Sequence, residues 1–284
     1  AEMYSVPARK ETQGSTERII GSWFKKTGNR DKIILASKVT GPFSLYQLER
    51  GPFNFSREQI NAALEGSLQR LQTDYIDLYQ LHRPQSSVPI DETLQALDDL
   101  VRAGKVRYIG LSEASAENIR KAHRTFPLTC VQSEYSLWER SVEERILPTL
   151  RELGIGFVPY SPLGRGLLAG QIKNADQLEE SDYRRNDPRY QGDNLGKNLR
   201  IVNQVKQLAR RYEASPAQMA LAWLLQKGQD IVPIPGTKKV KYLDENVAAL
   251  ELELSVEDLE ELDAVSQLTA GARYEPARME RIDR

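Results

Sequence analysis

Three residues of this 284-residue chain have types and positions that could move a proton. Tyr4 lies in the segment AEMY, Lys38 ends the apolar run KIILASK, and His82 ends the run YIDLYQLH. A lysine at the end of an apolar strand must pair with a carboxylate or lose some of its affinity for a proton. A lysine cation favours the phenolate of a neighbouring tyrosine, and a histidine can share the proton. The group therefore suits delivery of a proton from Tyr4 to a carbonyl oxygen.

Each of the three residues also has a purely structural interpretation. Lys38 could reach solvent from its strand end, His82 could close its strand before the proline turn of LHRP, and Tyr4 could be a packing residue. Only their combination favours catalysis.

The elements that must position these residues are short apolar runs that alternate with amphipathic helical patterns. We predict a first helix from Ser15 to Thr27, and helix starts where Ser56 precedes Gln59, Ser141 precedes Glu144 and Ser215 precedes Gln218 by three residues. The predicted strands are 32–38, 75–82, 106–112, 130–136, 155–162 and 230–236. Their near-continuous apolar character is typical of parallel strands covered on both faces.

The alternation of strands and helices indicates an α/β fold, and two features favour a (β/α)₈ barrel over an open sheet. No G-x-G-x-x-G fingerprint follows an early strand. Polar residues stand near the carboxyl ends of almost all the predicted strands, where a barrel assembles its site: Lys38, His82, Ser112, Gln132, Tyr160 and Gly236. We therefore expect one barrel domain over residues 1–284. Because six strands are too few to close it, we expect a strand, a helix and a second strand upstream of Ala1.

Composition excludes several other classes of protein. The chain has 39 Lys and Arg residues against 40 Asp and Glu, which gives no basic surface for nucleic acid or an anionic membrane. One Cys and two His are too few for a disulfide framework or a structural zinc site, and no metal is expected. No apolar run approaches the roughly 18 residues that span a bilayer. AEMYSVPARK has no signal-peptide pattern, so we expect a cytoplasmic protein.

The motifs AEMY, LASK, DLYQLHRP, GLSEAS, VQSEYSLW, YSPLGRGLL and IPGTKK followed by DEN occur in this order. With them the sequence resembles the aldo-keto reductases, barrel enzymes that use NADPH without a Rossmann domain. The resemblance implies reversible hydride transfer from NADPH to an aldehyde or ketone, with Tyr4 as the proton donor and Lys38 and His82 tuning it. The Asp of the family's catalytic tetrad would lie two residues before Ala1, upstream of the printed sequence.

The resemblance also implies how the chain would hold the cofactor. It assigns Ser112 and Gln132 to the nicotinamide carboxamide and Tyr160 to stacking on the nicotinamide ring. Glu113 stands where many relatives have Asn. Glu245 and Asn246 would lie near the adenine.

Two loops could receive the phosphate groups. The segment after the strand at 155–162 offers small residues whose backbone N–H groups could approach the pyrophosphate, with one added cation: Ser161, Leu163, Arg165 and Gly166. Gly236, Thr237, Lys238 and Lys239 precede a helical pattern, where a basic pair suits a 2′-phosphate. The alternative interpretation of the first loop is an ordinary turn, and that of the second is a solvated lysine pair.

Two other functions stay open at this stage. Lys38 could be the nucleophile of a Schiff-base aldolase barrel, which needs it neutral and accessible to substrate. The chain could instead be a non-catalytic, cofactor-binding regulatory or redox-sensing protein. The polar run 183–194 could form a substrate loop, and the tail 272–284 could cover the barrel mouth, although either could equally be solvated surface.

Overall fold

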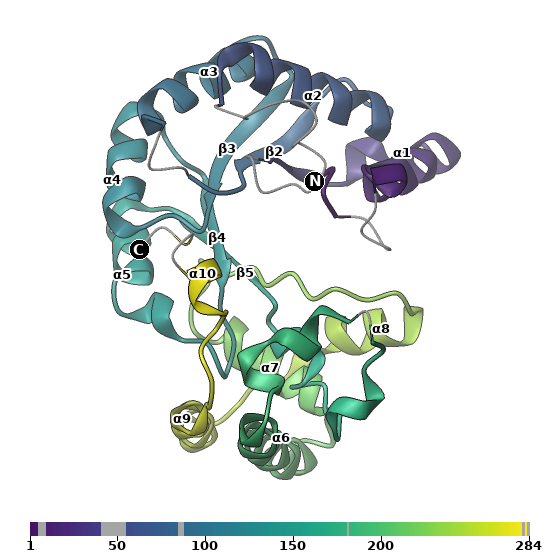
Figure 1. Cartoon of the computed structure of the whole chain (residues 1–284), viewed down its shortest axis with the longest axis vertical. Coiled ribbons are helices and arrows are strands. Elements are labelled where there is room, and N and C mark those ends of the chain that lie inside the picture. Colours follow the sequence, from purple (N-terminus) through teal and green to yellow (C-terminus); the bar gives the residue numbers. More distant parts are fainter. Residues whose placement is uncertain (5–9, 41–54, 85–87, 181, 280–281, 283–284) are drawn as a thin grey trace. The chain divides into compact units, whose positions relative to one another are not determined.

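A computed structural model of the chain describes residues 1–4, 10–40, 55–84, 88–180, 182–279 and 282 (Figure 1). The chain divides into two compact units, Ala1–Val131 and Gln132–Ile282. The strands follow one another in chain order, β1-β2-β3-β4-β5, and β4 (Cys130–Glu134) runs through the boundary between the units.

The first unit alternates helices with parallel strands. Its strands are β1 (Ala36–Val39), β2 (Ile76–Leu81) and β3 (Val106–Ser112), with β2 in the middle. Its helices are α1 (Ser15–Thr27), α2 (Arg57–Leu71), α3 (Ile90–Arg102) and α4 (Ala116–Thr125). The helices cover one face of the strands (Figure 1), which leaves the other face for a site.

The strand register decides which side chains share that other face. Lys38 pairs with Gln80, and Gln80 pairs with Gly110. Because side chains alternate along a strand, Ser112 shares the face of Gly110. The backbone N–H of His82 donates to the carbonyl of Val39 at 3.0 Å, so the ladder continues to His82, two residues beyond Gln80. Lys38, His82 and Ser112 therefore come to one face at the carboxyl ends of three strands.

The opposite face packs on the helices. Ser37 precedes Lys38, and its hydroxyl donates to the carboxylate of Glu17 in α1 at 2.7 Å. α1 approaches α2 closely at Gly21, where a Cβ atom would lie 2.3 Å from the carbonyl oxygen of Arg70. The predicted helix from Ser15 to Thr27 and the cap at Ser56 are confirmed.

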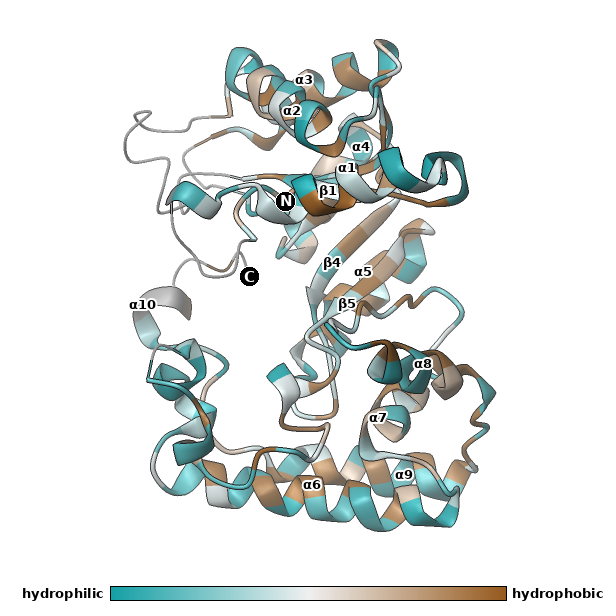
Figure 2. Ribbon diagram, turned by 90° about the vertical axis from the view of Figure 1, so that its right-hand side faces the viewer, coloured by the Kyte–Doolittle hydropathy of each residue, from teal (hydrophilic) through white to brown (hydrophobic). Residues whose placement is uncertain are grey.

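The second unit contains β5 (Gly156–Tyr160), which lies beside the end of β4, and several helices. These are α5 (Ile146–Leu153), α6 (Asp193–Arg211), α7 (Pro216–Leu225), α8 (Val240–Ala248), α9 (Val256–Val265) and α10 (Pro276–Met279). Hydrophobic and hydrophilic residues alternate along α6 in Figure 2, as in a helix with one buried face. α7 is almost wholly buried and begins at the predicted capping box of Ser215 and Gln218.

Two sequence predictions need correction in this unit. Residues 230–236 pair in parallel with β5 less completely than predicted: the N–H groups of Val232 and Ile234 donate to the carbonyls of Phe157 and Pro159 at 2.9 and 3.1 Å. Only the bridge from Phe157 to Ile231 is complete, because Pro159 lacks the N–H that would continue the ladder. Ser141 does not cap a helix. Its hydroxyl donates to Glu139 at 2.5 Å, and α5 begins only at Ile146.

Within the described residues, no helix combines the length and apolar character needed to cross a bilayer. The described His, Cys, Asp and Glu residues also form no group of three that could hold a metal ion.

Candidate active site

Tyr4, Lys38 and His82 lie together in the first unit. The Tyr4 hydroxyl is 3.1 Å from Nε2 of His82, and the Lys38 ammonium donates to it at 3.4 Å. The ammonium also lies 4.9 Å from the centre of the Tyr4 ring. Tyr4 is 45 % exposed, whereas Lys38 is 8 % exposed. The phenol is thus accessible from outside, and the lysine supports it from within the fold.

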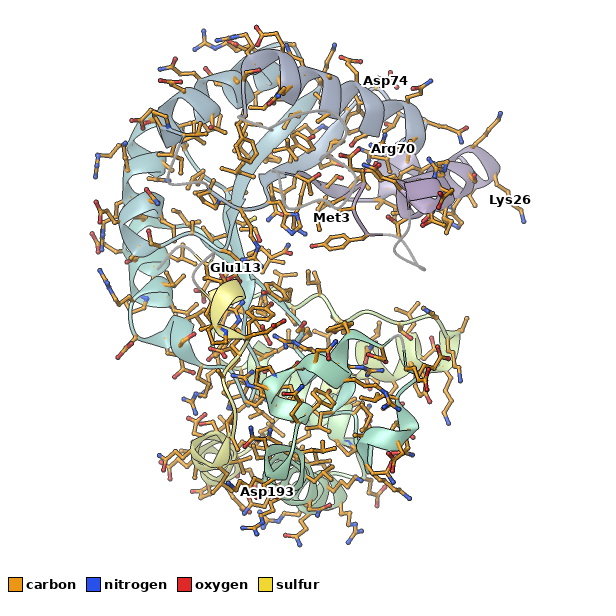
Figure 3. All side chains as sticks on the ribbon, viewed as in Figure 1. Met3, Lys26, Arg70, Asp74, Glu113 and Asp193 are labelled. Carbon is orange, nitrogen blue, oxygen red and sulfur yellow. The ribbon has the colours of Figure 1, made fainter. Side chains whose placement is uncertain are left out.

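Tyr4 lies in a turn, and a buried ion network holds the segment that carries it. Arg70 of α2 donates to Glu2 at 3.3 Å and to Glu17 of α1 at 2.7 Å. Figure 3 shows Arg70 where α1 meets α2, whereas Lys26 projects from the end of α1. Sequence reasoning missed Arg70, although two acidic residues buried near an apolar helix face require a cation.

Burial sets the protonation of the cluster. It lowers the pKa of Lys38 from 10.5 to about 8, and the Arg83 guanidinium adds to this fall while the influence of Cys130 opposes it. Burial, the Lys38 ammonium and Arg83 together hold the pKa of His82 well below its ordinary value. At neutral pH Lys38 is therefore cationic and His82 is neutral, and both side chains lie within hydrogen-bond distance of the Tyr4 oxygen.

Arg83 and Glu113 form a second pair near this cluster. The Arg83 guanidinium lies 3.7 Å from the carboxylate of Glu113, and the Glu113 side chain is 2 % exposed. Glu113 follows Ser112 with a φ of +56°, a strained conformation for a residue other than glycine. The sequence drew attention to Glu113 but not to Arg83, whose charge acts on both Lys38 and His82.

The residues assigned to the nicotinamide carboxamide are both buried. Ser112 ends β3 in the first unit and is 2 % exposed, and Gln132 lies in β4 in the second unit and is 5 % exposed. Ser112 lies at the carboxyl end of its strand as expected, whereas Gln132 lies in the middle of β4, and the role of both stays a prediction.

The loop after β5 differs from the expectation for a pyrophosphate site. Ser161, Gly164, Arg165 and Gly166 have positive φ, so the backbone turns sharply. However, the N–H groups of Gly164 and Gly166 already donate to the carbonyls of Ser161 and Leu163. The loop therefore offers fewer free amide donors than its composition suggested.

Arg165 is not presented to a ligand by this structure. Its guanidinium is 4 % exposed, donates to Glu134 at 2.8 Å and is ion-paired with Asp187. Burial alone would lower the pKa of Arg165, but the carboxylates, Glu134 above all, raise it above its ordinary value. In this structure the charge of Arg165 is balanced by internal ion pairs, and its predicted contact with a pyrophosphate stays a prediction.

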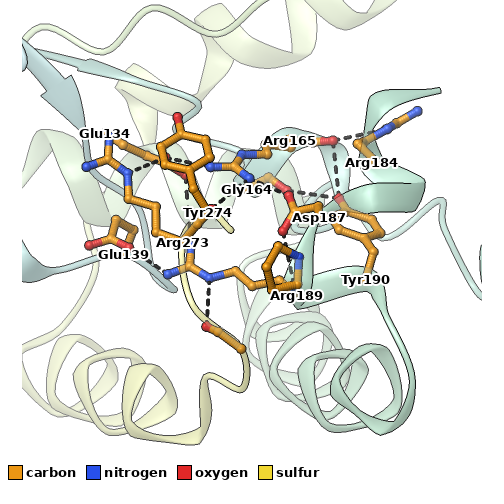
Figure 4. A network of polar contacts seen from close by, with 12 residues as sticks. Glu134, Glu139, Gly164, Arg165, Arg184, Asp187, Arg189, Tyr190, Arg273 and Tyr274 are labelled. Atoms are coloured by element: carbon orange, nitrogen blue, oxygen red, sulfur yellow. Dashed lines mark hydrogen bonds and ion pairs between the residues drawn. The ribbon is translucent and has the colours of Figure 1, made fainter. Parts of the chain in front are cut away.

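These ion pairs belong to a buried network in the second unit (Figure 4). Arg189 donates to Glu139 at 2.6 Å, and Arg273 donates to Glu134 at 2.7 Å. Tyr160, the residue assigned to stacking, accepts a hydrogen bond from Arg273 at 2.5 Å. Sequence analysis missed this network because Arg189 lies in a polar loop and Arg273 in the C-terminal tail, where charged residues are usually solvated.

The donor set at the start of α8 fits a phosphate group. Lys238 and Lys239 are exposed, and no described side chain caps the amide groups at this helix end. Gly236 and Thr237 precede them, and the Thr237 hydroxyl accepts from the Lys239 N–H at 3.2 Å. An uncapped helix start beside two cations is a favourable place for an anion.

Glu245 and Asn246 follow within α8 and are half-buried. The Glu245 carboxylate accepts a hydrogen bond from Ser215, the cap of α7. That bond holds the Glu245 side chain at the start of α7. The predicted position of Glu245 beside the adenine stays a prediction.

Comparison with known proteins agrees with this geometry. The sequence profile of the aldo/keto reductase family matches residues 1–267. Similar proteins include probable aldo-keto reductase 1 of Glycine max, 46 % identical over 92 % of this chain and 75 % of that protein. Another is the aldo-keto reductase yakc [NADP(+)] of Schizosaccharomyces pombe, 43 % identical over 95 % of this chain and 80 % of that protein.

A solved structure gives the same result for the fold. The thermostable aldo-keto reductase Tm1743, crystallised with the inhibitor epalrestat, is 32 % identical to this chain. The two match with a TM-score of 0.70 over 90 % of this chain and 80 % of that one. This match and the parallel strands confirm the predicted barrel class, and the chain belongs to the aldo/keto reductase family.

Proposed function

We propose that this protein reduces aldehydes or ketones to alcohols with NADPH, and that Tyr4 supplies the proton. The observation that carries the proposal is the position of the Tyr4 hydroxyl, 3.1 Å from His82 and 3.4 Å from Lys38 on a partly exposed ring. The NADP(+) in the name of the Schizosaccharomyces pombe relative supports the choice of cofactor.

Tyr4, Lys38 and His82 have different roles in the proposed proton transfer. The Lys38 ammonium donates to the Tyr4 oxygen, and His82 does the same when its proton is on Nε2. The phenolic hydrogen then remains for a substrate oxygen, and both donors stabilise the phenolate that its transfer leaves behind. When bound, NADPH supplies the hydride that the carbonyl carbon accepts. Tyr4 afterwards regains its proton from solvent.

The proposed cofactor contacts are those that the sequence predicted. Ser112 and Gln132 would bind the carboxamide, and Tyr160 would stack on the nicotinamide ring. Lys238 and Lys239 would bind the 2′-phosphate, with Glu245 and Asn246 near the adenine. We also propose that both units belong to one barrel domain, which is supported by the passage of β4 through both units and by the family match over residues 1–267.

Replacement of Tyr4 by Phe tests the proposed proton donor. The variant keeps the ring and loses only the acidic hydrogen, so NADPH affinity should survive. General acid catalysis contributes typically 10²–10⁴-fold, and the rate of aldehyde reduction should fall by about that much. A Phe variant that works at the wild-type rate would show that another group donates the proton.

Schiff-base chemistry is a second candidate because the lowered pKa of Lys38 makes its neutral amine, the nucleophilic form, easier to obtain. The 8 % exposure of Lys38 and its bond to Tyr4 favour the reductase. Borohydride treatment with a carbonyl substrate separates the two functions, since only an imine-forming lysine would become covalently trapped. If NADPH binds but no aldehyde in a broad panel is reduced, the non-catalytic function is favoured instead.

A further inference from the structure

Two consecutive residues of the C-terminal tail are buried although they lie beyond the family match. The match ends at residue 267, and Arg273 and Tyr274 follow it with exposures of 8 % and 7 %. A buried arginine is costly unless its donors are satisfied, so this tail segment must be held by specific partners.

The partners lie at the ends of β4 and β5. Arg273 donates through Nε to the fully buried carboxylate of Glu134 at 2.7 Å and through a terminal nitrogen to the Tyr160 hydroxyl at 2.5 Å. The hydroxyls of Tyr274 and Tyr160 lie 2.9 Å apart. Two neighbouring tail residues thus bind one tyrosine hydroxyl.

The charge network fixes the tail backbone as well as its side chains. Arg165 donates to the carbonyl of Arg273 at 3.1 Å, and its guanidinium lies 4.6 Å from the centre of the Tyr274 ring. Figure 4 shows Arg273 and Tyr274 between Glu134 and Arg165. Since Glu134 and Arg165 flank β5 in the chain, the tail is tied to the elements that carry Tyr160.

We propose that Arg273 and Tyr274 are positioning residues that fix the Tyr160 ring in the orientation that receives the nicotinamide. This inference rests on the proposed function. The final torsion of a tyrosine side chain is broad when nothing restrains it. A ring that is already fixed loses less freedom when the cofactor stacks on it, which strengthens binding. The planar fork of an arginine can bridge Glu134 and Tyr160, whereas a lysine ammonium fits such a bridge poorly.

Arg273→Lys tests the role, with Arg189→Lys as the matched control. Arg189 is 4 % exposed and donates to Glu139 at 2.6 Å and to the tail carbonyl of Gly271 at 3.4 Å. Its replacement therefore disturbs the same network and the same tail, but it removes no bond to Tyr160. We expect Arg273→Lys to weaken NADPH binding about fivefold, as the loss of one hydrogen bond would. The control should stay within about twofold, and the KM for aldehyde should hardly change in either variant. NADPH affinity is measured by fluorescence titration and folding by thermal unfolding.

Tyr160→Phe completes a double-mutant cycle with Arg273→Lys. If the Tyr160 hydroxyl transmits the effect, the double variant binds NADPH about as weakly as either single variant, whereas additive losses overturn the proposal. Tyr274→Phe removes one hydroxyl and no charge, and it should weaken binding about twofold even if the Arg273→Lys variant folds poorly.

The possible results separate this inference from the proposed function. Failure of the wild-type chain to bind NADPH would contradict both. If the wild type binds NADPH and neither Arg273→Lys nor Tyr274→Phe changes the affinity, only the positioning role is wrong. Equal losses in Arg273→Lys and Arg189→Lys would likewise overturn it, because they would show a general effect of the network.

Discussion

Replacing Lys38 by Met should make the protein more stable and nearly inactive. Burial lowers the pKa of Lys38 from 10.5 to about 8, which means that the fold resists the charged form. At about 1.4 kcal/mol for each pH unit, this difference corresponds to about 3 kcal/mol of unfavourable free energy at pH 7. Within the described residues, no carboxylate contributes to the pKa of Lys38.

Methionine would remove the buried charge and keep an unbranched chain of similar length. It would also lose the hydrogen bond and the cation–π contact to Tyr4, each of which is worth about 1 kcal/mol. The net gain in the free energy of unfolding should therefore be about 1 kcal/mol at pH 7. Reduction of aldehydes should fall by about 10² or more, because the ammonium no longer supports Tyr4.

The stability difference between the wild type and the Met variant should depend on pH. Between pH 8 and 10.5 the unfolded chain holds the Lys38 proton and the folded chain does not, so wild-type stability gains from this group as the pH rises. The advantage of the Met variant should be largest below pH 8, and it should diminish and then reverse toward pH 10.5. Urea unfolding at several pH values measures it, with Lys26→Met as the control because Lys26 is exposed at the end of α1. A pH-independent difference, or a variant that is less stable at every pH, would refute the reasoning.

Two further predictions concern the cofactor and the packing of the sheet. Lys238→Ala combined with Lys239→Ala should weaken NADPH binding about tenfold or more and leave NADH binding nearly unchanged, as charge-assisted contacts to a 2′-phosphate require; equal losses in titrations of the two cofactors would contradict the assignment. Gly110→Ala should lower the free energy of unfolding by about 1–3 kcal/mol, because its Cβ would lie 2.8 Å from the carbonyl oxygen of Cys130. The same substitution at Gly196 in α6, where no described atom would lie within 4 Å of the new Cβ, should raise it by about 1 kcal/mol in the same urea titration.

The sequence predicted the first part of the site well because its determinants are local. Apolar runs locate β1, β2 and β3, and a polar residue at the carboxyl end of a parallel strand comes to the same edge of the sheet as its neighbours. Lys38, His82 and Ser112 needed no other information. Tyr4 lies in no regular element, and its place among them depends on Arg70, a residue of α2 that no local pattern selects.

The candidate cofactor residues after β5 could be predicted less well, because their surroundings depend on contacts between distant segments. Arg165 follows a strand and precedes glycine, which is typical of a phosphate loop. Its partner Asp187 lies in a polar run that gave no sign of burial. Arg273 is more than a hundred residues from Tyr160, and no spacing rule connects them. Buried ion pairs of this kind follow from the tertiary fold.

The same ion pairs decide which groups of the second unit can meet an anionic cofactor. Arg165, Arg189 and Arg273 are matched by the carboxylates of Glu134, Glu139 and Asp187, so the buried network is close to neutral as a whole. A phosphate that recruited Arg165 would leave a buried carboxylate without its cation, which costs several kcal/mol. Lys238 and Lys239 carry no such cost because they are exposed beside the uncapped start of α8. Recognition of the dinucleotide by charge should therefore be concentrated at its 2′-phosphate end, and the loop after β5 should contribute through its backbone shape.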